Sequence, residues 1–179
     1  MNRATTAGKT LIPLMLALSA SGCGLTQKVS EGTASVTNSL FYKQIRTLHL
    51  DFRAREGANR NAQGAALSTV VRIWQLSDRQ AFDAADYPAL LAADSHVLRA
   101  ELMAQKAIRV RPGESVSIDM PMEERTEFVA VAGLFLSPDT QDDTWRLLLT
   151  RADLHPDRAR VIELGDGTLT LVAEKGERP

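Results

Sequence analysis

The chain has 179 residues, 44% of them hydrophobic and 24% charged, and its 21 basic and 22 acidic residues leave a formal net charge of −1. These proportions are typical of a globular protein and exclude a disordered or fibrous chain. Proteins that bind nucleic acid neutralise phosphates with clustered Lys and Arg. The sequence contains no such cluster, so we exclude nucleic acid as a partner.

The first 22 residues have the layout of a signal peptide. Arg3 and Lys9 precede the apolar run 11–18, small residues occupy 19–22, and no residue of the segment is acidic. A transmembrane helix needs about 20 consecutive apolar residues, far more than this run contains. We therefore predict that residues 1–22 direct export and are then removed.

The only cysteine, Cys23, follows this segment directly. A lone cysteine cannot pair within its own chain, so its position is the informative feature. Residues 18–23, LSASGC, resemble the lipobox of bacterial lipoproteins, which predicts acylation of Cys23; two or more acyl chains anchor a protein stably. Gly24 stands where lipoproteins kept in the inner membrane carry Asp, so we expect attachment to the outer membrane, facing the periplasm. The alternatives are cleavage near Ala20, which leaves a free thiol, and an uncleaved anchor.

Residues 23–45 are the predicted lipidated tether. Ser, Thr, Gly and Asn are frequent in it, yet Leu25, Val29, Val36 and Leu40 keep a roughly helical spacing. A short helix and a flexible spacer fit this composition equally well.

The globular domain, residues 46–179, is predicted to consist mainly of strands. In 46–54, apolar and polar residues alternate, which indicates one buried and one exposed face. In 67–76, hydrophobic residues occupy both faces, so another element must cover the second one.

We expect that cover to be a small helical insert at about 77–100, where cap residues precede good helix formers and Pro88 opens a second helix. Strands are predicted to resume at 107–111 and 115–120. The turn between them, 111–114, has Pro then Gly at its centre, as type II turns do, so we predict a hairpin.

The C-terminal part of the domain contains four more predicted strands. Residues 127–136 are apolar almost throughout, which indicates a central strand buried on both faces. The segment 144–150 alternates, and 161–164 and 168–172 flank Gly-Asp-Gly at 165–167, a hairpin turn signal. Many short strands at even spacing favour a β-sandwich.

The residues that could carry chemistry are scattered. His49, His96 and His155 fall in different segments without a second ligand at metal spacing, and three carboxylates at 139–143 fit a solvated turn better than a calcium loop. No nucleophile elbow, phosphate loop or dinucleotide motif appears. The sequence therefore predicts neither an enzyme nor a metal or cofactor site.

Several segments, taken in chain order, carry a family resemblance: the lipobox at Cys23, 47–54 (TLHLDFRA), 67–76 (LSTVVRIWQL), Phe82 with 85–87 and Leu90, 110–114 (VRPGE), 129–135, and the pair Trp145-Arg146. Their order and spacing resemble TssJ, the outer-membrane lipoprotein family of type VI secretion. The resemblance implies a mainly β, transthyretin-like sandwich of two four-stranded sheets with a small helical insert, and a protein without catalytic activity.

The resemblance also implies a partner and a site. Members of the family bind the periplasmic C-terminal region of the inner-membrane protein TssM, and so anchor a membrane complex that includes TssL. The loop between the first two strands makes the contact, and here it spans 55–66, whose polar composition suits recognition. The residues expected to bind the partner are Arg55, Glu56, Asn59, Arg60, Asn61 and Gln63. In the alternative interpretation the loop is a solvated connection. Residues 134–136 depart from the family, in which a Tyr-Arg pair is common at this place.

Two other functions remain open. A lipid-anchored carrier or chaperone-like sandwich would bind a small ligand or a peptide at a sheet edge, and a deep apolar cavity would favour it. A lipid-anchored hydrolase would need His96 or His155 clustered with carboxylates in a cleft.

Overall fold

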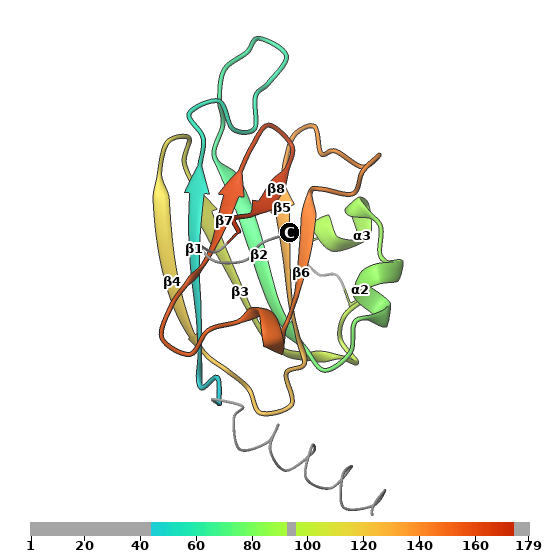
Figure 1. The fold of residues 1–179 in the computed structure, drawn as a ribbon. Coiled ribbons are helices and arrows are strands. Elements are labelled where there is room, and N and C mark those ends of the chain that lie inside the picture. Colours follow the sequence, from blue (N-terminus) through green and yellow to red (C-terminus); the bar gives the residue numbers. More distant parts are fainter. Residues whose placement is uncertain (1–43, 93–95, 174–179) are drawn as a thin grey trace, which may run out of the picture. The chain divides into compact units, whose positions relative to one another are not determined.

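The computed structural model describes residues 44–92 and 96–173 (Figure 1). The predicted signal peptide, Cys23 and all but the last two residues of the predicted tether lie outside the described residues. Within the described ranges, no helix has both the length and the apolar character needed to cross a membrane.

The domain is a sandwich of two four-stranded sheets, which confirms the predicted fold class (Figure 1). The first sheet has the strand order β4-β1-β7-β8 and the second has the order β3-β2-β5-β6. All neighbouring strands are antiparallel except β1 and β7, which run parallel. The strands are β1 (Thr47–Ala54), β2 (Thr69–Leu76), β3 (Leu102–Val110), β4 (Ser115–Pro121), β5 (Phe128–Leu134), β6 (Arg146–Thr150), β7 (Arg160–Leu164) and β8 (Leu169–Leu171), and a short 3-10 helix, η1 (Arg151–Asp153), follows β6.

The main core lies between the two sheets. Leu48, Leu50 and Phe52 of β1 have no exposed surface, and neither do Val71 and Ile73 of β2. The alternation predicted for the first strand is therefore confirmed. Each fully buried side chain of this size stabilises the fold by about 1.5–3 kcal/mol.

The apolar run after residue 127 forms β5, and its predicted central position is confirmed. β5 pairs with β2 on one side and with β6 on the other, and the five residues 129–133 are buried. Gly133 lies under the ring of Phe135, so closely that an added Cβ would come within 2.4 Å of a ring carbon.

Two short helices, α2 (Gln80–Ala84) and α3 (Tyr87–Leu91), belong to the predicted helical insert. They lie against the second sheet, on the side away from the first (Figure 1). Trp74 of β2 packs against Phe82 with ring centroids 6.2 Å apart, and Tyr87 meets Trp145 edge-on at 4.9 Å. The prediction that another element covers the second face of this strand is confirmed.

Two arginines of the sheet hold the insert in place. Arg146 donates from Nη1 to the carbonyls of Phe82 (2.7 Å) and Ala85 (2.9 Å), and Arg72 donates from Nη1 to those of Leu90 and Ala92, both at 2.8 Å. These carbonyls lie at the C-terminal ends of α2 and α3, where intrahelical partners run out. Helices of five residues are not stable alone, so these bonds and the apolar packing determine their position.

The predicted hairpin after residue 107 is wrong. The turn 111–114 forms as expected, with Glu114 N–H donating to Arg111 O at 3.0 Å and Gly113 at φ +72°. However, β3 pairs with β2 and β4 pairs with β1, so the turn crosses between the two sheets. A tight turn defines only the reversal of the chain, and the pairing follows from which neighbours bury the two strands.

β3 also begins earlier than predicted, at Leu102 instead of residue 107. The residues Leu102 to Lys106 include good helix formers and lack a regular alternation of burial. Pairing with β2 nevertheless makes them a strand, because tertiary contacts outweigh weak local preferences.

Candidate functional site

One end of the sandwich carries the segment that was predicted to bind a partner. The loop 55–66 leaves the end of β1 and extends beyond the other connections at this end, as Figure 1 shows. The turn 111–114 and the turn 165–167 lie beside its base, because β3 and β7 end on the same side as β1. We call the surface formed by the loop, these two turns and the first residues after β5 the end face.

The base of the loop is fastened to the neighbouring turns. Arg55 donates from its backbone N–H to Leu164 O at 3.0 Å, and its Nε donates to Glu163 Oε1 at 2.6 Å. The carbonyl of Arg55 accepts from Gly113 N–H at 3.3 Å. The first residue of the loop is therefore bonded to both β7 and the crossing turn.

Asn59 is the internal support of the loop. It is only 4% exposed, and its φ of +52° is in the left-handed region that Asn tolerates better than most residues. Its side-chain amide donates to Ser68 O at 3.2 Å, and its Oδ1 accepts from Leu136 N–H at 2.7 Å. Its own carbonyl accepts from Leu67 N–H at 3.1 Å, so this one residue joins the loop to both β2 and the end of β5.

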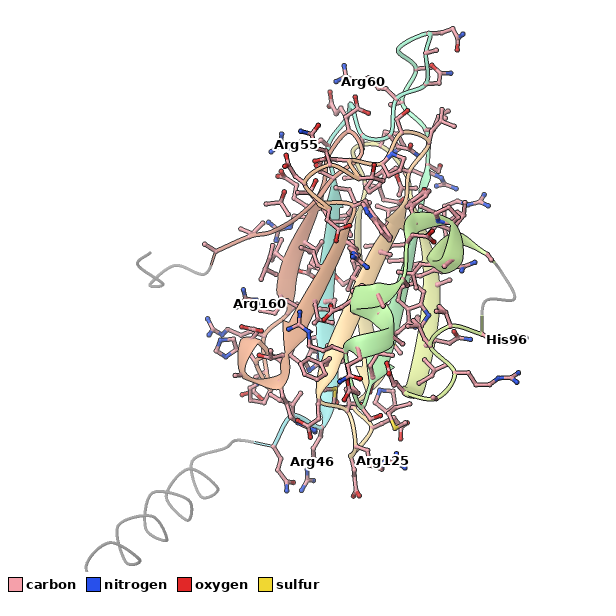
Figure 2. The ribbon with its side chains drawn as sticks, turned by 90° about the vertical axis from the view of Figure 1, so that its right-hand side faces the viewer. Arg46, Arg55, Arg60, His96, Arg125 and Arg160 are labelled. Carbon is pink, nitrogen blue, oxygen red and sulfur yellow. The ribbon has the colours of Figure 1, made fainter. Side chains whose placement is uncertain are left out.

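Arg60 joins the loop to the β7–β8 turn. Its backbone N–H donates to Asp166 Oδ1 at 2.8 Å, and its Nε donates to Asp166 Oδ2 at 3.0 Å. These bonds, first the one from the backbone N–H, hold the pKa of Asp166 below its ordinary value of 3.8. The labelled Arg55 and Arg60 both appear near the end face in Figure 2.

The tip of the loop is closed by Asn61. Its Oδ1 accepts from Gln63 N–H at 3.0 Å and from Ala65 N–H at 2.9 Å, and its carbonyl accepts from Gly64 N–H at 2.9 Å. Gly64 has a φ of +80°, which a residue with a side chain adopts only with strain. The tip is thus a folded turn that exposes residues 62–65.

The six predicted contact residues divide into two groups. Arg55, Asn59, Arg60 and Asn61 use their side chains to shape the loop, whereas Glu56 and Gln63 are exposed and their side chains make no hydrogen bond or ion pair within the described part of the chain.

Two exposed leucines, Leu67 and Leu136, were missed as members of this surface. They are 38% and 60% exposed, and the backbone N–H of each is bonded to Asn59. Both fell inside strands predicted from hydrophobicity, but β2 begins at Thr69 and β5 ends at Leu134. Hydrophobicity alone cannot separate a buried strand residue from an exposed one just beyond the strand.

The other candidate residues show no catalytic arrangement in ranges 44–92 and 96–173. His49 Nδ1 lies 2.5 Å from Asp119 Oδ1 on the surface, and the His155 ring contacts Arg158. No group of three or more His, Cys, Asp or Glu in these ranges could hold a metal ion. Asp139 accepts from the Thr144 hydroxyl at 2.7 Å, which is the first cause of its lowered pKa, and forms the expected surface turn.

The fold therefore defines a transthyretin-like β-sandwich module with a structured loop at one end. Residues 46–167 match the family model described as type VI secretion lipoprotein, VasD, EvfM, TssJ. This chain belongs to that family of type VI secretion lipoproteins, whose role is structural and not enzymatic. The family predicted from the sequence is confirmed.

Solved structures support the same assignment. The chain is 47% identical to a chain of the structure described as "T6SS protein TssM C-terminal domain (869-1107) from EAEC", with a TM-score of 0.67 over 73% of this chain and 100% of that one. It is 49% identical to a chain of a "Type VI membrane complex", with a TM-score of 0.70 over 73% of this chain and 100% of the other. The T6SS lipoprotein TssJ1 from Pseudomonas aeruginosa is 26% identical, with a TM-score of 0.62 over 75% of this chain and 100% of that one. Comparison with curated proteins gives no match.

Proposed function

We propose that this lipoprotein is anchored in the outer membrane by acyl chains on Cys23 and binds the periplasmic C-terminal region of TssM through its end face. It would thereby fix a type VI secretion membrane complex, of which TssL is a further component, to that membrane. The observation that carries the proposal is the preformed loop 55–66, with two exposed leucines beside its base. Relatives at 47% and 49% identity come from structures described as a TssM C-terminal domain and a type VI membrane complex.

The direction of β1 supports an anchor at one end of the sandwich and a partner-binding loop at the other. The described chain enters at Gln44, and β1 then runs eight residues, Thr47–Ala54, to the loop. Eight residues of strand span roughly 25 Å at about 3.3 Å per residue. An anchor attached before Gln44 thus joins the sandwich at the end opposite the loop, which leaves the loop accessible from the periplasm.

The end face has the properties of a protein-binding surface. Leu67 and Leu136 offer apolar area, and Glu56 and Gln63 are exposed polar residues of the same loop. Interfaces commonly combine an apolar centre with a polar rim. Because Asn59 and Asn61 already hold the loop in shape, less conformational entropy is lost when a partner binds.

Leu136→Ser tests the interface. Leu136 is 60% exposed, so its truncation removes contact area without creating a core cavity. We expect the Kd for the purified TssM region to rise about tenfold, which corresponds to about 1.4 kcal/mol, with unchanged thermal stability. Leu91→Ser is the matched control, since Leu91 is 43% exposed on α3 away from the end face, and it should leave the Kd unchanged. Equal affinities of wild type and Leu136→Ser would contradict the assignment.

Fractionation of cells tests the anchor independently. Cys23→Ser should move the protein to the soluble fraction, because the chain then lacks the buried methylenes that hold it. Gly24→Asp should keep it in membranes but shift it to the inner-membrane fraction. Membrane retention of Cys23→Ser would disprove the lipid anchor while leaving the TssM interface untouched. We place TssL in the complex through TssM, so complexes purified through Leu136→Ser should contain less of both proteins than complexes purified through the wild type. Undiminished recovery of TssL where TssM is lost would contradict this indirect association.

A further inference from the structure

Two strand edges lie free on one side of the sandwich. In the described part of the chain, β3 pairs only with β2 and β4 pairs only with β1, and the turn 111–114 joins these two outer strands directly (Figure 1). The opposite side is closed, since Leu169 N–H of β8 donates to Thr144 O, just before β6, at 2.7 Å. A free edge presents backbone N–H and C=O groups with which strands of other molecules can pair. Unwanted pairing would therefore begin at β3 or β4.

The edge of β4 ends in a proline, whereas the edge of β3 contains none. Pro121 has no N–H, and its carbonyl accepts from Gln75 Nε2 at 2.8 Å, so neither group is available to another strand. In β3 the register with β2 shifts between Gln75 and Leu76, but the pairing is regular from Ala104 to Val110. The regular stretch of β3 therefore lacks the protection that a proline gives.

One charged residue of this stretch, Lys106, has the orientation of the core residues. On the face of β3 that looks toward the first sheet, Val110 belongs to the core, and Ala104 and Ile108 pack against it. Lys106 lies in the same row, opposite Ile73 of β2, which is fully buried between the sheets. Directly opposite residues of an antiparallel pair point to the same face. The Lys106 side chain therefore starts toward the interior, and it is exposed because β3 is the outermost strand.

We propose that Lys106 prevents strands of other molecules, a second copy of this chain included, from pairing with the free edge of β3. A further strand would cover the side on which the Lys106 side chain reaches water. In residues 44–92 and 96–173 no carboxylate forms an ion pair with Lys106, so its ammonium would be buried without a counter-charge. Burying an unpaired charge is strongly unfavourable, and inward-pointing charges on edge strands oppose such pairing. The proposal requires neither the lipid anchor nor TssM binding, so its failure would leave the proposed function unaffected.

Sedimentation equilibrium of the full chain in density-matched neutral detergent tests the proposal. Lys106→Val removes the charge and completes the apolar inner row of β3. We expect the wild type to stay monomeric and the variant to dimerise with a Kd at least about hundredfold lower, which corresponds to about 2.8 kcal/mol. Arg109→Val is the matched control, because Arg109 is exposed opposite Val70 on the other face of β3, and it should stay monomeric. A folded Lys106→Val that is as monomeric as the wild type, or a control that dimerises equally, would overturn the proposal.

Hydrogen exchange at increasing protein concentration locates the contact. In Lys106→Val the amides of β3 should exchange at least about tenfold more slowly as the dimer forms, while those of β6, on the closed side, should not change. Protection of β6 without protection of β3 would refute the proposal.

Two further variants separate charge from shape. Lys106→Arg keeps the charge and should stay monomeric, and its dimerisation to the same extent as Lys106→Val would show that charge is not the cause. If circular dichroism shows that Lys106→Val does not fold, Lys106→Gln takes its place, since it removes the charge and keeps a polar side chain. It should dimerise more strongly than the wild type, and a monomeric Lys106→Gln would then refute the proposal.

Discussion

Replacing Asn59 by Ala should loosen the loop from the sandwich. The substitution removes the donor to Ser68 O (3.2 Å) and the acceptor for Leu136 N–H (2.7 Å), and both partners then lack their bond in a region where Asn59 is only 4% exposed. It also places Ala at a φ of +52°, where its Cβ crowds the following carbonyl.

The expected magnitude is the sum of these two effects. Two lost side-chain hydrogen bonds at about 1 kcal/mol each contribute about 2 kcal/mol. The left-handed backbone conformation adds about 1 kcal/mol for Ala and almost nothing for Gly. We therefore expect a loss of about 3 kcal/mol in the free energy of unfolding for Asn59→Ala and about 2 kcal/mol for Asn59→Gly. For a domain of this size, 1 kcal/mol lowers Tm by about 4 °C, so the shifts are about 12 °C and about 8 °C.

Thermal unfolding measured by circular dichroism, together with TssM affinity, provides the assay. Gln63→Ala is the control, because its exposed side chain makes no hydrogen bond in the described ranges and its loss should not change Tm. A loss below about 0.5 kcal/mol for Asn59→Ala would refute the reasoning, since it would mean that the buried bonds contribute nothing net. If Asn59→Gly lowered the free energy of unfolding more than Asn59→Ala does, the backbone contribution would be refuted.

Three further predictions concern other parts of the domain. Gly133→Ala should cost about 1–3 kcal/mol by overpacking, because the new Cβ would lie 2.4 Å from the Phe135 ring, and chemical denaturation measures the loss. Arg146→Ala should speed hydrogen exchange of the helical insert by more than tenfold, because the carbonyls at the end of α2 lose a charged donor. The folded-state pKa of Asp166 is lowered, so its stabilising bond to Arg60 is fully present above pH 3.8 and is lost as the pH falls through that lowered pKa. Hydrogen exchange of the loop amides, measured against pH, should show this loss of protection in the wild type. The Asp166→Asn variant should not show it.

Matched variants control for each change. Gly57→Ala should cost little, since its new Cβ meets only the flexible Arg60 side chain at 3.7 Å. Arg79→Ala removes an arginine that bonds Asp83 on the surface and should leave exchange of the insert nearly unchanged. Asp142→Asn removes an exposed carboxylate that does not bond Arg60 and should retain the pH dependence of the loop. If a control reproduces the effect of its test variant, the corresponding explanation is wrong.

The local sequence was sufficient to predict those strands in which apolar residues alternate regularly with polar ones or form an unbroken run. The alternation in β1 and the apolar run of β5 predicted strands, and the structure confirms them because each pattern matches the faces that the sandwich buries. Gly-Asp-Gly at 165–167 likewise predicted the β7–β8 hairpin. The family resemblance came from the order of such segments, and the matching family model over 46–167 confirms it.

The sequence by itself determined the strand content, the insert, the family and the position of the loop, because these depend on short-range patterns and their order. Only the tertiary structure decided that β3 and β4 separate into different sheets, that Asn59 faces inward, and that Leu136 stays exposed. The physical reason is that these properties depend on which distant segments pack together, and pairing and burial are long-range effects that no local pattern encodes.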